Sequence, residues 1–364
     1  MTGRAGRRAF FEESMKSISV NSYAKINLSL DVQGLTKDGY HQVSMIMQQI
    51  SLHDDVLVCF LPFRERKDAV YLLQNRPKKE RLCESSVQKE ENDGDSEMEI
   101  MLSSNRPYLP KDRRNLAYRA AELMISRYGR NTALCGGLLR IDIKKRIPVA
   151  AGLAGGSGNA AAVIHALNKI FELRLSMQEL MKIGGELGSD VPFCLMGQAR
   201  CNPVLDQYLR KNRMAASAAV AEGRGTVLRP VKGLRSSIVL VKPAFSVSTR
   251  EVYAGIDREI EFIERRHEIL RPDNKELIEG LREKDYQKIT RNMVNVLELY
   301  TLKAYPYVGK IKEAMAEKTA ADAVLMSGSG PTVYGIYHDK AEARSAYRLM
   351  RKQEKETYLT NTTY

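Results

Sequence analysis

Aromatic side chains are scarce in this sequence, and tryptophan is absent. Only 7% of the 364 residues are aromatic, and most of these are tyrosines. Hydrophobic residues as a whole make up 43% of the chain, which is ordinary for a globular protein. We therefore expect aliphatic cores, in a chain long enough for two domains that share a cleft.

Cysteine and histidine are also few, and neither forms a metal-binding pattern. The five cysteines include no Cys-x-x-Cys pair, and the five histidines form no His-Glu-x-x-His pattern. An odd number of scattered cysteines indicates reduced thiols rather than a disulfide framework. A zinc site therefore has little support, and we expect no metal centre built from side chains.

Long apolar runs are missing as well. No stretch approaches the roughly 20 apolar residues of a membrane-spanning helix. Residues 1–14 carry basic side chains together with Glu12 and Glu13 but no long apolar segment, which makes them a poor signal peptide. We interpret them as an N-terminal extension and expect a cytoplasmic protein with no membrane partner.

Positive charge, in contrast, is in excess, with a formal net charge of +13. This excess is compatible with nucleic-acid binding or with an enzyme whose substrates are anions. The lysines and arginines are spread along the chain, and no aromatic-rich strand lies among them. The sequence favours anionic small molecules, and we expect no nucleic-acid partner.

The order of apolar patterns predicts an α+β chain. A charge-dense segment over 63–97 interrupts it, and such a composition is typical of a solvated, disordered insertion. A domain boundary is expected near 231–237. The expected strands are 18–32, 43–52, 54–60, 137–148, 237–243 and two strands around a glycine turn within 323–337. The expected helices are 115–129, 159–173, 177–188, several after Pro243 that are interrupted near Pro272, and 339–352.

One glycine-rich loop stands out, between the strand 137–148 and the helix that follows it. Its sequence, IPVAAGLAGGSGNAAA, has four glycines within seven residues, more than a plain strand-to-helix turn needs. Glycines expose backbone N–H groups, and a helix N-terminus adds partial positive charge, so the loop predicts a phosphate-binding cradle. It matches neither the Walker A pattern nor Gly-x-Gly-x-x-Gly.

Several blocks together resemble the GHMP kinase superfamily. PVAAGLAGGSGNAAA is similar to the ATP-binding motif of these kinases, and LMSGSGPTVYGIY is similar to their third, C-terminal motif. SYAKINLSLDVQGLTKDGYH resembles the N-terminal motif of the members that act on a cytidine diphosphate-linked methylerythritol. GSDVPFCLMG and AEGRG are also family-like, and the blocks follow one another in family order.

The resemblance implies a two-domain GHMP kinase fold of the α+β class. Its N-terminal domain would resemble domain 2 of ribosomal protein S5, and its C-terminal domain would be ferredoxin-like. The expected division places the N-terminal extension at 1–14, an ATP-binding domain at 15–232 and the C-terminal domain at 233–364. Stretches near 63–97 and 201–218 have no counterpart in the family pattern, and we expect insertions there.

The same resemblance implies ATP-dependent phosphorylation of the 2-hydroxyl of the cytidine diphosphate-linked methylerythritol, a step of the non-mevalonate (MEP) route to isoprenoid precursors. The donor would be ATP with Mg²⁺, and the metal would be held mainly by phosphates and water. The partner would be this small molecule, and the chain a monomer or homodimer. Alternatives are another GHMP kinase, such as one for homoserine or mevalonate, or a homologue weakened or silenced catalytically.

The resemblance also assigns the site residues. Lys25 and Asp190 would face the substrate hydroxyl, where a carboxylate can orient it and an ammonium can stabilise developing negative charge. Each of them singly also fits a plain structural role, as a strand lysine and a turn aspartate. The expected substrate-binding residues are Asn27, Tyr40, His41, Thr249 and Tyr253, with the base between the two tyrosine rings and His41 at its edge. The expected ATP-binding residues are Asn115, Lys145, Pro148, Val149, Ala150, Ala151, Gly152, Leu153, Ala154, Gly155, Gly156, Ser157 and Gly158.

Overall fold

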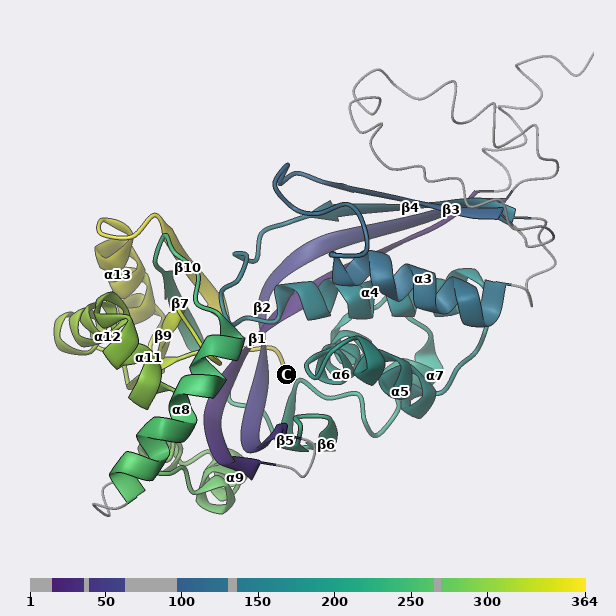
Figure 1. Cartoon of the computed structure of the whole chain (residues 1–364). Helices are drawn as coiled ribbons and strands as arrows, with labels where there is room; N and C mark the ends of the chain where they lie inside the picture. Colours follow the sequence, from purple (N-terminus) through teal and green to yellow (C-terminus); the bar gives the residue numbers. More distant parts are fainter. Residues whose placement is uncertain (1–14, 36–38, 63–96, 130–135, 265–269) are drawn as a thin grey trace, which may run out of the picture.

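The computed structural model of the chain describes residues 15–35, 39–62, 97–129, 136–264 and 270–364. The expected extension and nearly all of the expected insertion near 63–97 lie outside these residues. Two β-sheets and the helices packed on them form the described part (Figure 1). None of its helices has the length and apolar character that a bilayer crossing requires.

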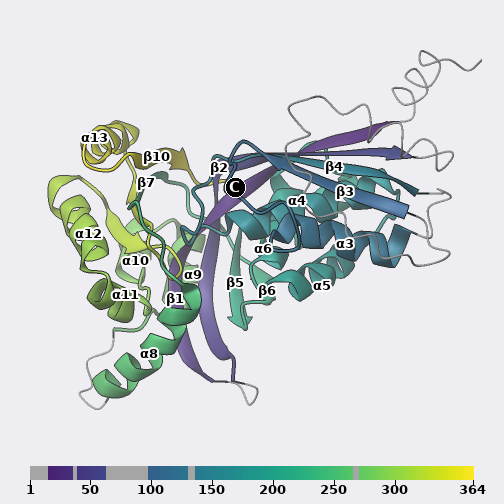
Figure 2. The same ribbon diagram turned by 45° about the horizontal axis from the view of Figure 1, so that its top comes forward.

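The first sheet is built from six strands, with helices on one of its sides (Figures 1 and 2). Its order is β3-β4-β2-β5-β6, and β1 also pairs with β2; only β3 and β4 run parallel. The strands are β1 Lys16–Leu35, β2 His41–Pro62, β3 Glu97–Ser104, β4 Gly136–Lys144, β5 Ala218–Gly223 and β6 Val227–Pro230. The helices are α3 Leu116–Tyr128, α4 Gly155–Ile170, α5 Met177–Leu187, α6 Val191–Cys201 and α7 Gln207–Arg210.

The second sheet has four antiparallel strands in the order β10-β7-β9-β8. Helices α12 and α13 pack against it. Its strands are β7 Ser237–Lys242, β8 Ala323–Met326, β9 Val333–Tyr337 and β10 Glu356–Asn361. The helices of this half are α8 Thr249–Glu264, α9 Asn274–Glu283, α10 Tyr286–Arg291, α11 Glu298–Ala304, α12 Pro306–Lys318 and α13 Lys340–Arg351.

Strand β2 corrects one prediction. The sequence predicts two strands, 43–52 and 54–60, but the structure has a single strand across both. Asp54 and Asp55, which indicate a break, are accommodated inside the sheet. Asp54 is fully buried and accepts hydrogen bonds from the backbone N–H groups of Arg146 and Ile147. Its charge is satisfied by tertiary partners, which no local pattern reveals.

Strand β3 and helix α6 were not predicted at all. Nearly every residue of α6 is buried, so it lacks the alternating polar face by which amphipathic helices are recognised. Its start does carry a local helix-start signal, because Pro192 lies in the first turn, two residues after the N-cap residue Asp190. Strand β3 pairs with β4 along its length, and this non-local pairing decides its structure.

Strands β1 and β2 connect the two halves of the molecule. Both are long, curved strands that run from the first sheet toward the second half (Figures 1 and 2). Ile18 packs in the core under the first sheet, Ile26 in the core shared with the second sheet, and Leu30 in the core beside α8. Along the sequence, all strands of the first sheet precede residue 231, and all strands of the second sheet follow residue 236. Because β1 contributes to every one of these cores, the domain boundary suggested by the sequence stays a proposal.

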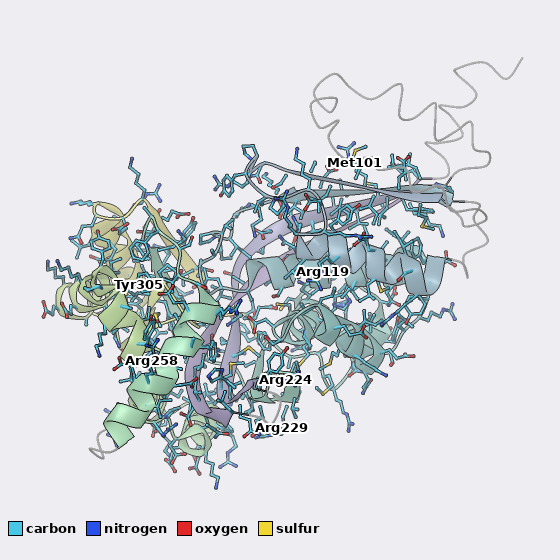
Figure 3. The ribbon with its side chains drawn as sticks, viewed as in Figure 1. Met101, Arg119, Arg224, Arg229, Arg258 and Tyr305 are labelled. Carbon is cyan, nitrogen blue, oxygen red and sulfur yellow. The ribbon has the colours of Figure 1, made fainter. Side chains whose placement is uncertain are left out.

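Exposed arginines are distributed over both halves. Arg119 lies on α3, Arg229 on β6 and Arg258 on α8, and Figure 3 shows these labelled side chains on well-separated elements. The excess positive charge is therefore carried by several surfaces of the described chain.

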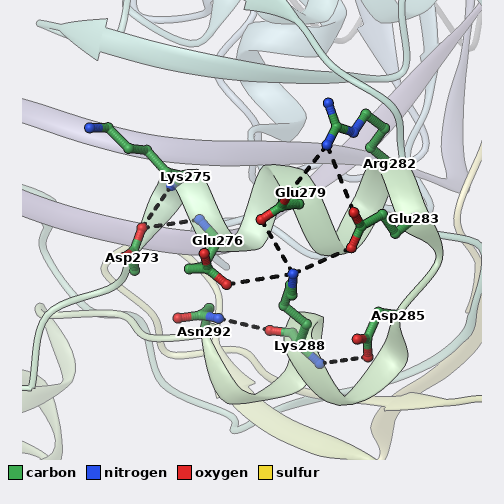
Figure 4. Close-up of polar contacts among 9 residues, drawn as sticks. All are labelled: Asp273, Lys275, Glu276, Glu279, Arg282, Glu283, Asp285, Lys288 and Asn292. Carbon is green, nitrogen blue, oxygen red and sulfur yellow. Dashed lines mark hydrogen bonds and ion pairs between the residues drawn. The ribbon is translucent and has the colours of Figure 1, made fainter.

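The α9–α10 corner is organised by charged side chains (Figure 4). Asp273 and Asp285 cap the two helices by accepting backbone hydrogen bonds at their first turns. Lys288 Nζ lies 3.3 Å from carboxylate oxygens of both Glu279 and Glu283. Such exposed ion pairs are screened by salt and add little stability singly. These ion pairs join α10 to α9, and α9 in turn packs against β2.

Asn295 holds the turn between β8 and β9, which the first half also contacts. Its buried amide donates to the backbone oxygens of Met326 and Gly328, both at 2.8 Å. Its own oxygen accepts from the N–H of Leu297 at 3.1 Å. One side chain therefore satisfies three backbone groups and fixes the shape of this turn.

We predict that Asn295→Ala lowers the free energy of unfolding by roughly 2–4 kcal/mol, because the carbonyls of Met326 and Gly328 both lose the buried amide that donates to them. Urea denaturation measures this change. Asn292→Ala is the control: its amide bonds the Lys288 carbonyl at the end of α10, and we expect a loss of about 1 kcal/mol or less. Equal losses in the two variants would contradict the role given to Asn295.

Candidate functional site

A cavity of about 950 Å³ lies where the two halves meet. Nineteen of the twenty site residues expected from the sequence line it, so the structure brings the distant blocks together. The exception is Gly158, which lies inside α4. A Cβ at Gly158 would be 2.5 Å from the Ser22 hydroxyl, so this glycine lets α4 pack against β1.

The glycine-rich loop has an unusual backbone at one side of this cavity. Ala150 and Ala154 have φ angles of 50° and 55°, a left-handed conformation that is costly for residues with a Cβ. Ala154 is also the N-cap of α4, and no side chain bonds the helix's first N–H groups. Those groups are suited to an anion, as the sequence predicts for a phosphate.

The loop is fixed by contacts from both halves. The backbone N–H of Lys25 donates to Leu153 O at 3.2 Å, and the Ser327 hydroxyl donates to Gly152 O at 3.0 Å. Gly152 has a φ of 72°, and a Cβ there would lie 2.2 Å from Ser327 O. Glycine is therefore required for the close approach of the β8–β9 turn to the loop.

Lys145 brings a buried positive charge to the same loop. Its Nζ is 2.5 Å from a carboxylate oxygen of Asp54, and both side chains are almost completely buried. A Cβ at Gly155 would be 2.9 Å from this nitrogen, which places the ammonium at the start of α4. Asp54 was not predicted as a site residue, although an acidic residue beside apolar strand residues is a signal of a buried charge.

Lys25 and Asp190 lie together on the cavity wall. Lys25 Nζ is 3.7 Å from Asp190 Oδ2 and donates to Asn27 Oδ1 at 2.7 Å. The register of β1 against β2 shifts between Tyr23 and Lys25 and again after Asn27. Such bulges re-aim side chains, and here they flank the residues that face the cavity.

Asp190 begins α6 without using its carboxylate as a cap. Its charge reaches neighbouring groups. Burial chiefly, and Asp190 secondarily, raise the pKa of the Tyr253 hydroxyl and of the Cys194 thiol. Lys25, Asp190 and Tyr253 all line the cavity.

Tyr40, His41 and Tyr253 contribute aromatic rings to the same cavity. The rings of His41 and Tyr253 are 4.9 Å apart and tilted by 50°. The guanidinium carbon of Arg224, in the turn between β5 and β6, lies 3.8 Å above the centre of the Tyr40 ring. Thr249 hydrogen-bonds Ser329 of the β8–β9 turn at 2.9 Å. Arg224, which lies in the AEGRG block and lines the cavity, was not predicted as a site residue.

The structure places no group of three or more metal-ligating side chains among the described residues. Asn115 caps α3 at the cavity edge by accepting from Ala117 N at 3.0 Å, close to the open N-terminus of α4.

Two sequence families match this chain. The family described as GHMP kinases N terminal domain matches residues 115–198, and GHMP kinases C terminal matches residues 267–356. A 4-diphosphocytidyl-2-C-methyl-D-erythritol kinase of Alkaliphilus metalliredigens is 39% identical over 349 residues, which is 96% of this chain and 97% of that protein. The chain belongs to the GHMP kinase family.

Solved structures agree with this GHMP kinase assignment. A crystal structure of 4-(cytidine 5'-diphospho)-2C-methyl-D-erythritol kinase is 25% identical, with a TM-score of 0.66 and coverage of 95% of this chain and 100% of that one. Homoserine kinase from Cytophaga hutchinsonii, 13% identical, has a TM-score of 0.60 over 95% of this chain and 96% of its own, and it shows the fold alone. The two-domain GHMP kinase fold expected from the sequence is confirmed.

We predict that Gly152→Ala weakens binding of a non-hydrolysable ATP analogue at least tenfold and lowers the melting temperature, because the added Cβ overlaps Ser327 O. Calorimetry and thermal unfolding measure the two effects. Gly309→Ala in α12 is the control, because a Cβ there meets nothing within 4 Å. Unchanged analogue binding in Gly152→Ala would contradict the proposed cradle.

Proposed function

We propose that this GHMP kinase transfers the γ-phosphate of ATP to the 2-hydroxyl of 4-diphosphocytidyl-2-C-methyl-D-erythritol, in the MEP route to isoprenoid precursors. One observation carries the proposal: Lys25 and Asp190 lie 3.7 Å apart in a single cavity that the glycine-rich loop and two tyrosines also line. Full-length similarity to kinases of this name supports the choice of substrate.

In this proposal the two substrates enter from opposite ends of the cavity. The triphosphate lies against the open N-terminus of α4, with Lys145 beside it. The cytosine lies between Tyr40 and Tyr253, and aromatic stacking adds about 0.5–1.5 kcal/mol beyond burial. The methylerythritol then reaches the middle of the cavity, where Lys25 and Asp190 are.

Asp190 orients the attacking hydroxyl and is placed to accept its proton, while Lys25 stabilises the charge on the transferring phosphoryl group. Asn27 fixes the Lys25 ammonium. Mg²⁺ neutralises phosphate charge when it is bound with ATP. We expect the phosphates and water to hold it.

The insertion expected near 201–218 does not weaken this proposal. Leu205 and Leu209 are buried in the core under the first sheet, and no described residue of 201–218 lines the cavity. The segment is therefore part of the packing behind the site and leaves the cleft open.

Purified protein incubated with ATP, Mg²⁺ and one of three alcohols tests the proposal through ADP release. We expect rapid turnover with the cytidine diphosphate-linked methylerythritol and almost none with homoserine or mevalonate. Faster turnover of homoserine or mevalonate would identify a different GHMP kinase activity. No turnover with any of the three would support a catalytically silent homologue.

We predict that Asp190→Asn lowers kcat more than tenfold, a loss above ~1.4 kcal/mol, with ATP binding nearly unchanged. The amide keeps the size of the side chain and removes its charge. Lys25→Ala should behave similarly. Asp206→Asn is the matched control, because Asp206 pairs with Lys169 outside the cavity. An Asp190→Asn rate above a tenth of wild type would overturn the assigned role.

We also predict that a uridine analogue of the substrate is used about a hundredfold less efficiently. Cytosine and uracil exchange donor and acceptor at their edge, and each buried mismatch costs about 1–3 kcal/mol. His41→Ala should narrow this difference, because the tyrosine faces do not distinguish the bases. Equal kcat/KM values for the two bases in the unaltered enzyme would remove the cytidine site.

A further inference from the structure

His41 is held from one face of α8. Tyr253 and Asp257 are four residues apart on this helix, so their side chains lie on the same face. The Tyr253 ring packs against the imidazole at 4.9 Å between ring centres, and an Asp257 oxygen lies 2.8 Å from His41 Nε2. The imidazole is largely buried, with 16% of its side chain exposed.

The contact with Asp257 decides which nitrogen of the ring carries a proton. A carboxylate only accepts hydrogen bonds, so Nε2 must be the donor in the 2.8 Å bond. In a neutral imidazole the other nitrogen, Nδ1, is then an acceptor. His41 and Tyr253 line the cavity, whereas Asp257 does not, so the aspartate acts from behind the ring.

Cytosine and uracil differ in the exocyclic group that a hydrogen-bond acceptor on the protein would meet. Cytosine presents an exocyclic amine, which donates, and uracil presents a carbonyl oxygen at the same position, which accepts. An imidazole with an acceptor at Nδ1 would bond the amine and face the carbonyl lone pair to lone pair. A ring with the opposite tautomer would reverse this preference.

We propose that Asp257 is a specificity-positioning residue, which holds His41 in the tautomer protonated at Nε2 so that Nδ1 accepts from the amine of cytosine. This inference rests on the proposed function, since it names what recognises the base of that substrate. Asp257 itself touches neither substrate nor phosphate. Its effect is on the choice of base and on KM for the nucleotide-linked alcohol.

Kinetics with the cytidine substrate and its uridine analogue test the inference. We expect Asp257→Ala to reduce the ratio of the two kcat/KM values at least tenfold, to the ratio of His41→Ala. KM for the cytidine substrate should rise while kcat stays within about threefold, because an amine bond of this kind contributes roughly 1–3 kcal/mol to binding. Adding Asp257→Ala to His41→Ala should change nothing more.

Glu259→Ala is the matched control. Glu259 lies two residues further along α8 and bonds Lys303 at 2.8 Å, so the variant removes a carboxylate from the same helix without touching His41. It should keep the base ratio of the unaltered enzyme. A normal ratio in Asp257→Ala, or an equal loss in Glu259→Ala, would overturn the inference.

The tautomer can be measured without any variant and without substrate. In ¹⁵N NMR spectra of the His41 ring at neutral pH, we expect a protonated Nε2 and an unprotonated Nδ1. A proton on Nδ1 would overturn the inference even if Asp257→Ala does not fold. If the unaltered enzyme phosphorylates neither nucleotide, the proposed function fails. If it prefers cytidine and the Asp257 variant does so equally, the inference fails alone.

Discussion

Lys25 carries a positive charge into a position where only 6% of its side chain is exposed, and that charge has to be compensated. Asn27, two residues further along β1, accepts a hydrogen bond from the ammonium. Asp190 supplies the opposite charge from the start of α6. For the two groups to meet, β1 must bulge and α6 must begin at the cavity wall. The chemistry proposed for this enzyme depends on this contact.

The contact in turn depends on both halves of the molecule. The Tyr334 hydroxyl of β9 donates to Asn27 O at 2.7 Å, and Ser327 of the β8–β9 turn bonds the glycine-rich loop. Asn295 fixes that turn by donating to two of its backbone oxygens. The first half supplies Lys25, Asp190 and the glycine-rich loop, while the second half holds them in place and adds Tyr253 from α8. Neither half alone forms the cavity.

The glycines of the loop themselves predicted a phosphate-binding turn, whereas Lys25 and Asp190 were assigned by the resemblance of the short blocks that contain them to GHMP kinase motifs. The loop and both residues line the cavity. The single long β2 and helix α6 were missed because neighbouring strands and burial decide them. Asp54 and Asp257 were missed for the same reason: their partners, Lys145 and His41, are 91 and 216 residues away. Gly158 was assigned to ATP but has a packing role.

The position of the substrate hydroxyl relative to Asp190 decides whether Lys25 and Asp190 act on it. A crystal structure with a non-hydrolysable ATP analogue and 4-diphosphocytidyl-2-C-methyl-D-erythritol would show it. We predict the 2-hydroxyl oxygen at about 2.6–3.2 Å from an Asp190 oxygen, with the terminal phosphate of the analogue beside Lys25. A complex in which that hydroxyl points away from Asp190, or in which the base lies outside the Tyr40 and Tyr253 rings, would contradict the account.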